Sequence, residues 1–216
     1  VVFSLLVGVL YSAGALYGER RDRSILFWKS LPVSDLTAVL AKAAVPLVVL
    51  PLIVFAVAVA ATSLMIILQT LVWLADGFDP RELWARVDLP SLWLFLLYGL
   101  PFMALWYAPI YAWLLLVSGW AERWPVLWAA APFVAVLIVE HLLLHQTPAH
   151  WLLERRLGGG VLQPYTVDGA GAVWIERLSE LEPARLYSLP GLWIGLIIAA
   201  ALLAAAVRLR RSRGPI

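Results

Sequence analysis

The chain alternates between long apolar runs and short charged connections, and this alternation predicts membrane-spanning helices. A helix needs about 20 apolar residues to cross the hydrocarbon core of a bilayer. Runs that meet this requirement, or nearly so, occupy residues 1–18, 43–75, 89–119, 125–144 and 188–207. We therefore expect an all-α, polytopic integral membrane protein with five visible spans. The run 43–75 is longer than one perpendicular crossing requires, so we expect that helix to tilt.

Composition narrows the class of protein further. Hydrophobic residues make up 63% of the 216 residues, and charged residues only 14%. A soluble domain of this length has too little interior to hide so much apolar surface, and disordered chains have the opposite composition. The absence of cysteine excludes a disulfide scaffold. The basic residues are scattered among apolar runs and form no face for nucleic acid. We expect residues 1–216 to form a single domain whose solvent is the lipid bilayer.

The basic residues predict the orientation of the spans. Five spans place the connections alternately on two sides, and ten of the sixteen Lys and Arg residues fall on the side of 19–42, 122–123 and the tail. Cytoplasmic loops carry the excess of Lys and Arg. The C-terminus is therefore expected in the cytoplasm. The longest connection, 145–187, is expected to form a small extracytoplasmic helical cap.

The segment 19–42, between the first two long runs, carries the most information. A charged stretch, Arg20 to Arg23, precedes the apolar stretch Ile25 to Trp28, and Pro32 stops any helix before it. Ser34 or Asp35 can then cap the next helix. These features predict a short helix from Ser24 to Leu31 that lies across the cytoplasmic face. Such a helix can bury its apolar side chains among lipid headgroups, or it can dock into a groove of another protein.

This segment resembles the cytoplasmic loop of the permease subunits of type-2 ATP-binding-cassette (ABC) exporters. In that family a charged Glu-Arg pair ends one span, a short coupling helix follows, and an LPVS turn precedes a helix with a lysine. The corresponding residues here are Glu19-Arg20, Leu31-Pro32-Val33-Ser34 and Lys42. The family has six spans in each subunit. Because the sequence begins at Val1 inside an apolar run, we expect one further span upstream of it.

The resemblance implies a transport subunit of the bacterial inner membrane that works with partners. Two permease subunits, identical or different, would pair around a translocation route, and separate ATPase subunits would dock on the coupling helices. This sequence has no G-x-x-x-x-G-K-[ST] phosphate loop, so we expect no enzymatic activity of its own, and ATP and Mg²⁺ are expected on the partner. The implied ATPase interface has apolar anchors and steering charges: Glu19, Arg20, Arg21, Arg23, Ile25, Phe27, Trp28, Lys29 and Leu31.

Polar residues inside the spans offer weaker hypotheses. Glu140 is the only carboxylate within a predicted span, and with His141 it could line a translocation route or form a structural pair near the interface. His141 and His145 share a helical face, but their spacing differs from that of zinc proteases, so we expect no metal site. A different class of function also fits the chain. It could be a non-transporting assembly or sensor subunit whose short helix binds a cytoplasmic partner.

Overall fold

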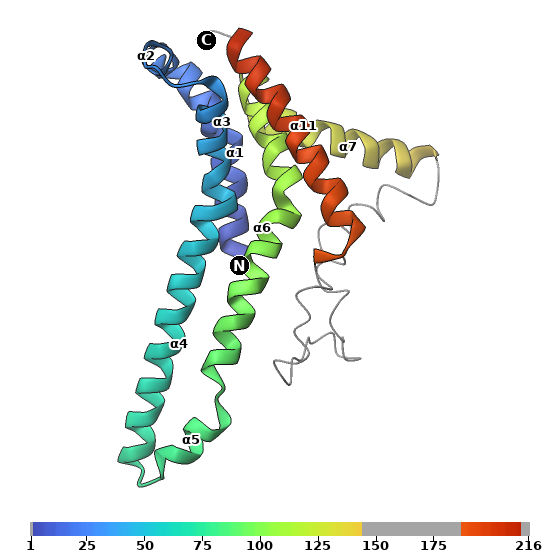
Figure 1. Cartoon of the computed structure of the whole chain (residues 1–216). Coiled ribbons are helices and arrows are strands. Elements are labelled where there is room, and N and C mark those ends of the chain that lie inside the picture. The colour runs from blue at the N-terminus through green and yellow to red at the C-terminus, as the bar shows by residue number, and fades with distance from the viewer. Residues whose placement is uncertain (1, 144–186, 213–216) are drawn as a thin grey trace.

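The computed structural model describes residues 2–143 and 187–212, and in this part of the chain every regular element is a helix (Figure 1). In chain order the elements are α1 (Val2–Arg21), α2 (Ser24–Ser30), α3 (Asp35–Ala44), the π-helical turn η1 (Val45–Val49), α4 (Leu50–Ala75), α5 (Pro80–Arg86), α6 (Leu89–Trp120), α7 (Pro125–Leu143) and α11 (Pro190–Ser212). The predicted all-α fold is confirmed. The predicted cap, 145–187, lies outside the described residues except for its last position.

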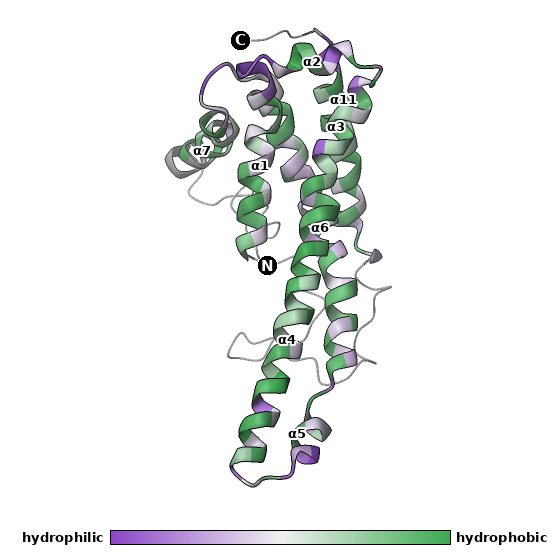
Figure 2. Cartoon of the chain, turned by 90° about the vertical axis from the view of Figure 1, so that its left-hand side faces the viewer, coloured by the Kyte–Doolittle hydropathy of each residue, from purple (hydrophilic) through white to green (hydrophobic). Residues whose placement is uncertain are grey.

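Three helical segments in the described part are long and apolar enough to cross a membrane: Asp35–Ala75, Pro80–Trp120 and Pro190–Ser212. They correspond to the second, third and fifth of the predicted spans. The other two spans stay predictions. Helix α7 (Pro125–Leu143) coincides with the fourth predicted span, and Pro125–Val136 is its described apolar stretch. Both views show α7 crosswise to α6 rather than alongside it (Figures 1 and 2).

The second predicted span is one long helical segment with a local defect near its start. Pro46 lies at the first turn of η1, where the hydrogen-bond pattern widens to a π-helix between α3 and α4. A proline inside a helix has no N–H to donate and its ring crowds the carbonyl four residues earlier. A π-helical turn accommodates this conflict without ending the helix. The segment therefore continues without a break from Asp35 through the apolar run to Ala75.

The core is built around the upper half of α6, which contacts α1 on one side and α11 on the other. Leu115 of α6 is fully buried where α1, α3 and α11 meet, against Leu16, Val39 and Ala206. Further along, Ala108 and Ala112 of α6 pack against Ala199 of α11. Small side chains of this kind let membrane helices approach closely. Four elements are thus held together at the end of the molecule that carries α2.

The lower half of α6 pairs with α4 in a long hairpin that α5 closes (Figure 1). Only Ile66 of α4 is buried, and its other residues are exposed or half-buried. The helix is apolar along most of its length (Figure 2). Indole N–H groups join the hairpin, since Trp84 donates to Thr70 and Trp93 donates to Thr62, each at 3.2 Å. The exposed apolar surface of α4 is suited to lipid.

Candidate functional site

The short helix α2 stands at the end of the bundle as a projecting knob. Its chain leaves α1 at Arg21 and turns at Arg23, whose φ of 58° lies in the left-handed region. Ile25 points inward and is 2% exposed, whereas Phe27 is 61% and Trp28 43% exposed. The two aromatic rings contact each other edge to face, with 5.6 Å between their centroids. One apolar side chain anchors the helix, and a larger apolar surface faces outward.

The helix after the knob begins where the sequence predicts. Ser34 is the N-cap of α3, and its hydroxyl oxygen accepts a hydrogen bond from the backbone N–H of Thr37 at 3.1 Å. Such a cap satisfies one of the free N–H groups of the first helical turn. Asp35 occupies the first turn, where its negative charge interacts favourably with the positive end of the helix dipole. Of the two predicted caps, Ser34 is therefore the one that the structure uses.

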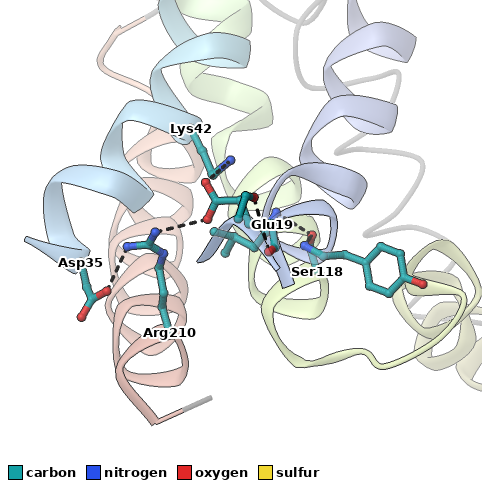
Figure 3. Close-up of polar contacts among 8 residues, drawn as sticks. Glu19, Asp35, Lys42, Ser118 and Arg210 are labelled. Carbon is teal, nitrogen blue, oxygen red and sulfur yellow. Dashed lines mark hydrogen bonds and ion pairs between the residues drawn. The ribbon is translucent and has the colours of Figure 1, made fainter. Parts of the chain in front are cut away.

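An ionic cluster of four residues fastens the base of this segment (Figure 3). Glu19 at the end of α1 lies 3.0 Å from Lys42 Nζ of α3 and 3.2 Å from a guanidinium nitrogen of Arg210 of α11. A second guanidinium nitrogen of Arg210 lies 2.9 Å from Asp35. Two carboxylates thus face two cations, so the cluster is charge-balanced. We call these residues the latch.

The latch is largely withdrawn from solvent. The side chain of Arg210 is 4% exposed, that of Glu19 13%, and those of Lys42 and Asp35 about a fifth. Arg211, next in the chain, is a contrast: its side chain is 68% exposed and its Nε lies 4.0 Å from Asp35. Removing one member of a buried pair leaves the other as an uncompensated charge, which is far more costly than losing a surface pair. The latch therefore holds α1, α3 and α11 in one arrangement.

A second set of contacts ties α1 to the end of α6. Arg20 is 5% exposed and donates hydrogen bonds from one guanidinium nitrogen to the carbonyls of Gly119 and Ala121, at 2.8 and 3.2 Å. A cation at the C-terminus of a helix also interacts favourably with its dipole. The hydroxyl oxygen of Ser118 accepts from the backbone N–H groups of Leu16 and Tyr17, at 3.0 and 2.9 Å (Figure 3).

The predicted interface residues differ in exposure. Ile25 and Arg20 are buried, and the side chain of Glu19 is 13% exposed in contact with α3 and α11. The residues that do face outward are Arg21, Arg23, Phe27, Trp28, Lys29 and Leu31. Leu26, which was not singled out from the sequence, is 56% exposed beside them. We call these seven outward residues the docking face.

The other predicted pair, Glu140 and His141, lies at the far end of α7. The structure gives the helical backbone of both residues, and their side chains lie outside the described part. His145 also falls outside it. Within the described residues no group of three His, Cys, Asp or Glu side chains could hold a metal ion.

Sequence reasoning missed the partners that complete the latch. It singled out Glu19 and Lys42 by resemblance, but Asp35 was considered only as a helix cap and Arg210 only as part of a basic tail. The contact between Arg210 and Asp35 spans 175 positions of the chain. The available signal was the presence of a carboxylate in the first turn of α3 and of a cation in the last turn of α11.

Comparisons with protein-family models, with curated proteins and with solved structures found no match.

Proposed function

We propose that this chain is the permease subunit of a type-2 ABC exporter, and that α2 is its coupling helix. The observation that carries the proposal is a short apolar knob at the basic end of a bundle of long apolar helices. Three apolar side chains, Leu26, Phe27 and Trp28, project from α2. Aromatic residues of this kind dominate the binding energy of protein interfaces when they fill a pocket of the partner. The partner in this proposal is a separate ATPase subunit with a groove for α2.

The contacts behind the knob support a coupling role. A displacement of α2 acts directly on α1, which continues into it, and on α3, which follows it. The latch extends the connection to α11, and the contacts of Arg20 and Ser118 extend it to α6. A partner can shift a conformational equilibrium only through contacts that differ between the two states. In our proposal ATP binding and hydrolysis on the ATPase change the contacts at the docking face, and the attached helices move together.

The remaining parts of the proposal concern assembly and location. ATP and Mg²⁺ bind to the ATPase subunits, and this chain contributes no catalytic residue. A second permease subunit pairs with this one around the route for the substrate. The chain lies in the bacterial inner membrane as a multi-pass protein with its C-terminus in the cytoplasm. The cluster of outward arginines around α2 and the end of α11 supports this orientation.

Co-purification tests the proposal. The neighbouring reading frames are first searched for a phosphate-loop ATPase. The full chain, affinity-tagged and expressed with such an ATPase, should retain it in mild detergent. The double variant Phe27→Ala, Trp28→Ala should release it and should still insert into the membrane. A matched control is Trp73→Ala, Phe78→Ala, because these rings also contact each other, 5.8 Å apart, at the opposite end of the molecule.

The two outcomes separate the proposed function from the alternative class. Loss of the ATPase in the α2 variant and its retention in the control support docking at α2. Full retention in both variants contradicts the proposed docking face. If no ATPase is retained by the unmodified chain while another cytoplasmic protein depends on Phe27 and Trp28, the chain is instead an assembly or sensor subunit.

A further inference from the structure

Tryptophan side chains enclose a groove at the turn between α6 and α7. Trp120 and Trp128 face each other across this turn, edge to face, with 5.2 Å between ring centroids. Two hollows share these two rings, so they adjoin one another. The groove lies at the same end of the molecule as α2, because Arg20 of α1 contacts the carbonyls of Gly119 and Ala121 in the turn.

One part of the groove is apolar and the other is polar. The apolar part has a volume of about 380 Å³, and α6, α7 and α11 line it with Trp113, Leu116, Val117, Trp120, Trp128, Pro132 and Leu209. The polar part has a volume of about 450 Å³, and here Glu122 and Arg123 join the two shared rings. A ligand that fills both parts must be amphipathic, with an apolar chain attached to a polar head.

The polar part offers hydrogen-bond donors that have no acceptor within the described residues. The indole N–H groups of Trp120 and Trp128 lack a partner there, as does the exposed guanidinium of Arg123. Glu122 is different, because it already takes part in an interaction within the chain. Hydrogen-bond donors that line one hollow, one of them positively charged, suit the oxygen atoms of a phosphate group.

The walls of the groove are fixed by hydrogen bonds. Trp113 Nε1 donates to the carbonyl of Ala129 at 3.1 Å, which holds α7 against α6. The backbone of Trp124 has a φ of 54°, a strained value for this residue, and its carbonyl accepts from the N–H of Leu127 at 3.0 Å. The shape of the groove is therefore set by the fold before any ligand enters.

We propose that this groove binds one anionic phospholipid from the leaflet at the α2 end of the protein. The phosphate lies beside Arg123 and the two indole N–H groups, and one acyl chain follows the apolar part toward Pro132 and Leu209. Exposed arginines gather at this end of the molecule, namely Arg21, Arg23, Arg123, Arg208 and Arg211. Basic residues at the membrane surface attract anionic lipids, so a lipid with net negative charge is favoured over a zwitterionic one. This site is separate from the docking face of α2.

Fluorescence quenching by brominated lipids tests the proposal directly. The full chain is reconstituted in phosphatidylcholine vesicles that contain a small, equal fraction of either phosphatidylglycerol or phosphatidylcholine brominated on one acyl chain. The chain has twelve tryptophans. The fluorescence of the groove is therefore obtained by subtracting the fluorescence of the variant Trp120→Phe, Trp128→Phe from that of the unmodified chain. We expect brominated phosphatidylglycerol to quench this difference signal several-fold more strongly than brominated phosphatidylcholine.

Two arginine variants identify the charge that selects the lipid. Arg123→Gln should reduce the preference for phosphatidylglycerol roughly fivefold, which corresponds to the contribution of one basic residue at an anionic surface. Arg81→Gln is the matched control, since Arg81 is exposed at the opposite end of the hairpin, and it should leave the preference unchanged. Arg123→Lys should retain most of it.

Specific results overturn the proposal. Equal quenching by the two brominated lipids means that the groove meets only the bulk bilayer. An absence of quenching by both means that another helix or a second copy of the chain covers the two rings. If Arg123→Gln leaves the preference for phosphatidylglycerol unchanged, Arg123 does not belong to the site. If Arg123→Gln is not recovered in folded form, the comparison of the two lipids on the unmodified chain still decides between binding and bulk contact.

Discussion

Replacing Arg210 by methionine removes the guanidinium group that joins α11 to both Glu19 and Asp35. Methionine keeps an unbranched apolar chain in the same space, so the main loss is the charge. Lys42 still neutralises Glu19 at 3.0 Å, whereas Asp35 keeps only the distant and exposed Arg211. Breaking a buried ion pair by removing one partner costs about 3 to 5 kcal/mol. For a chain of this length, each kcal/mol corresponds to about 2 to 4 °C of melting temperature.

We therefore expect Arg210→Met to lower the melting temperature by about 6 to 20 °C. Intrinsic tryptophan fluorescence of the purified chain in detergent measures this shift. The matched control is Arg211→Met, because an exposed pair at the margin of contact contributes about 0 to 1 kcal/mol, and its shift should be a few degrees at most. The double variant Arg210→Met, Asp35→Asn should recover part of the loss, since it removes the unpaired carboxylate. Equal shifts for the two arginine variants, or no recovery in the double variant, would refute the latch.

Three further predictions concern the helix contacts and the hairpin. Ser118→Ala should lower the stability of the fold by about 0.5 to 1.5 kcal/mol because the backbone N–H groups of Leu16 and Tyr17 lose the hydroxyl that ties α1 to α6, and faster hydrogen exchange in α1 should show it. Gly8→Ala should lower the melting temperature, since the added Cβ would lie 2.9 Å from a ring carbon of Tyr111. Gly14→Ala has open space around its Cβ and should stabilise α1 by about 1 kcal/mol, which raises the melting temperature. Asp88 is the N-cap of α6, and its carboxylate accepts a hydrogen bond from the backbone N–H of Ser91 at 3.2 Å, so Asp88→Ala should lower the stability of the fold by about 1 kcal/mol. Asp88→Asn should retain most of that stability because an asparagine side chain also caps helices, and a melting temperature of Asp88→Ala equal to that of the unmodified chain would contradict the cap.

The elements with strong local signals could be predicted from the sequence. Pro32 followed by Ser34 marks a stop and a cap, and the structure ends α2 and begins α3 there. Pro90 and Pro190 likewise lie at helix starts. These signals involve neighbouring residues, so local backbone chemistry decides them without knowledge of the rest of the fold.

The positions of side chains around the knob could not be predicted in the same way. Glu19, Arg20 and Arg21 are adjacent charged residues, yet the first two are withdrawn into contacts with α3, α6 and α11, and the third is exposed. Their environments depend on which helices meet at the end of α1, and that is a tertiary property. The crosswise course of α7 is another example, because an apolar run indicates that a helix is buried or lipid-facing but carries no information about its direction.

The docking of α2 on an ATPase is the central claim, and site-specific cross-linking tests it most directly. The chain has no cysteine, so Leu31→Cys places a unique thiol at the edge of the docking face, and Phe78→Cys places one at the exposed opposite end. Each variant is labelled with a photoreactive cross-linker in membranes that contain the neighbouring ATPase. Our account predicts a cross-link to the ATPase from position 31 that changes in yield when ATP is bound, and none from position 78. No cross-link from position 31, with the ATPase present and active, would contradict it.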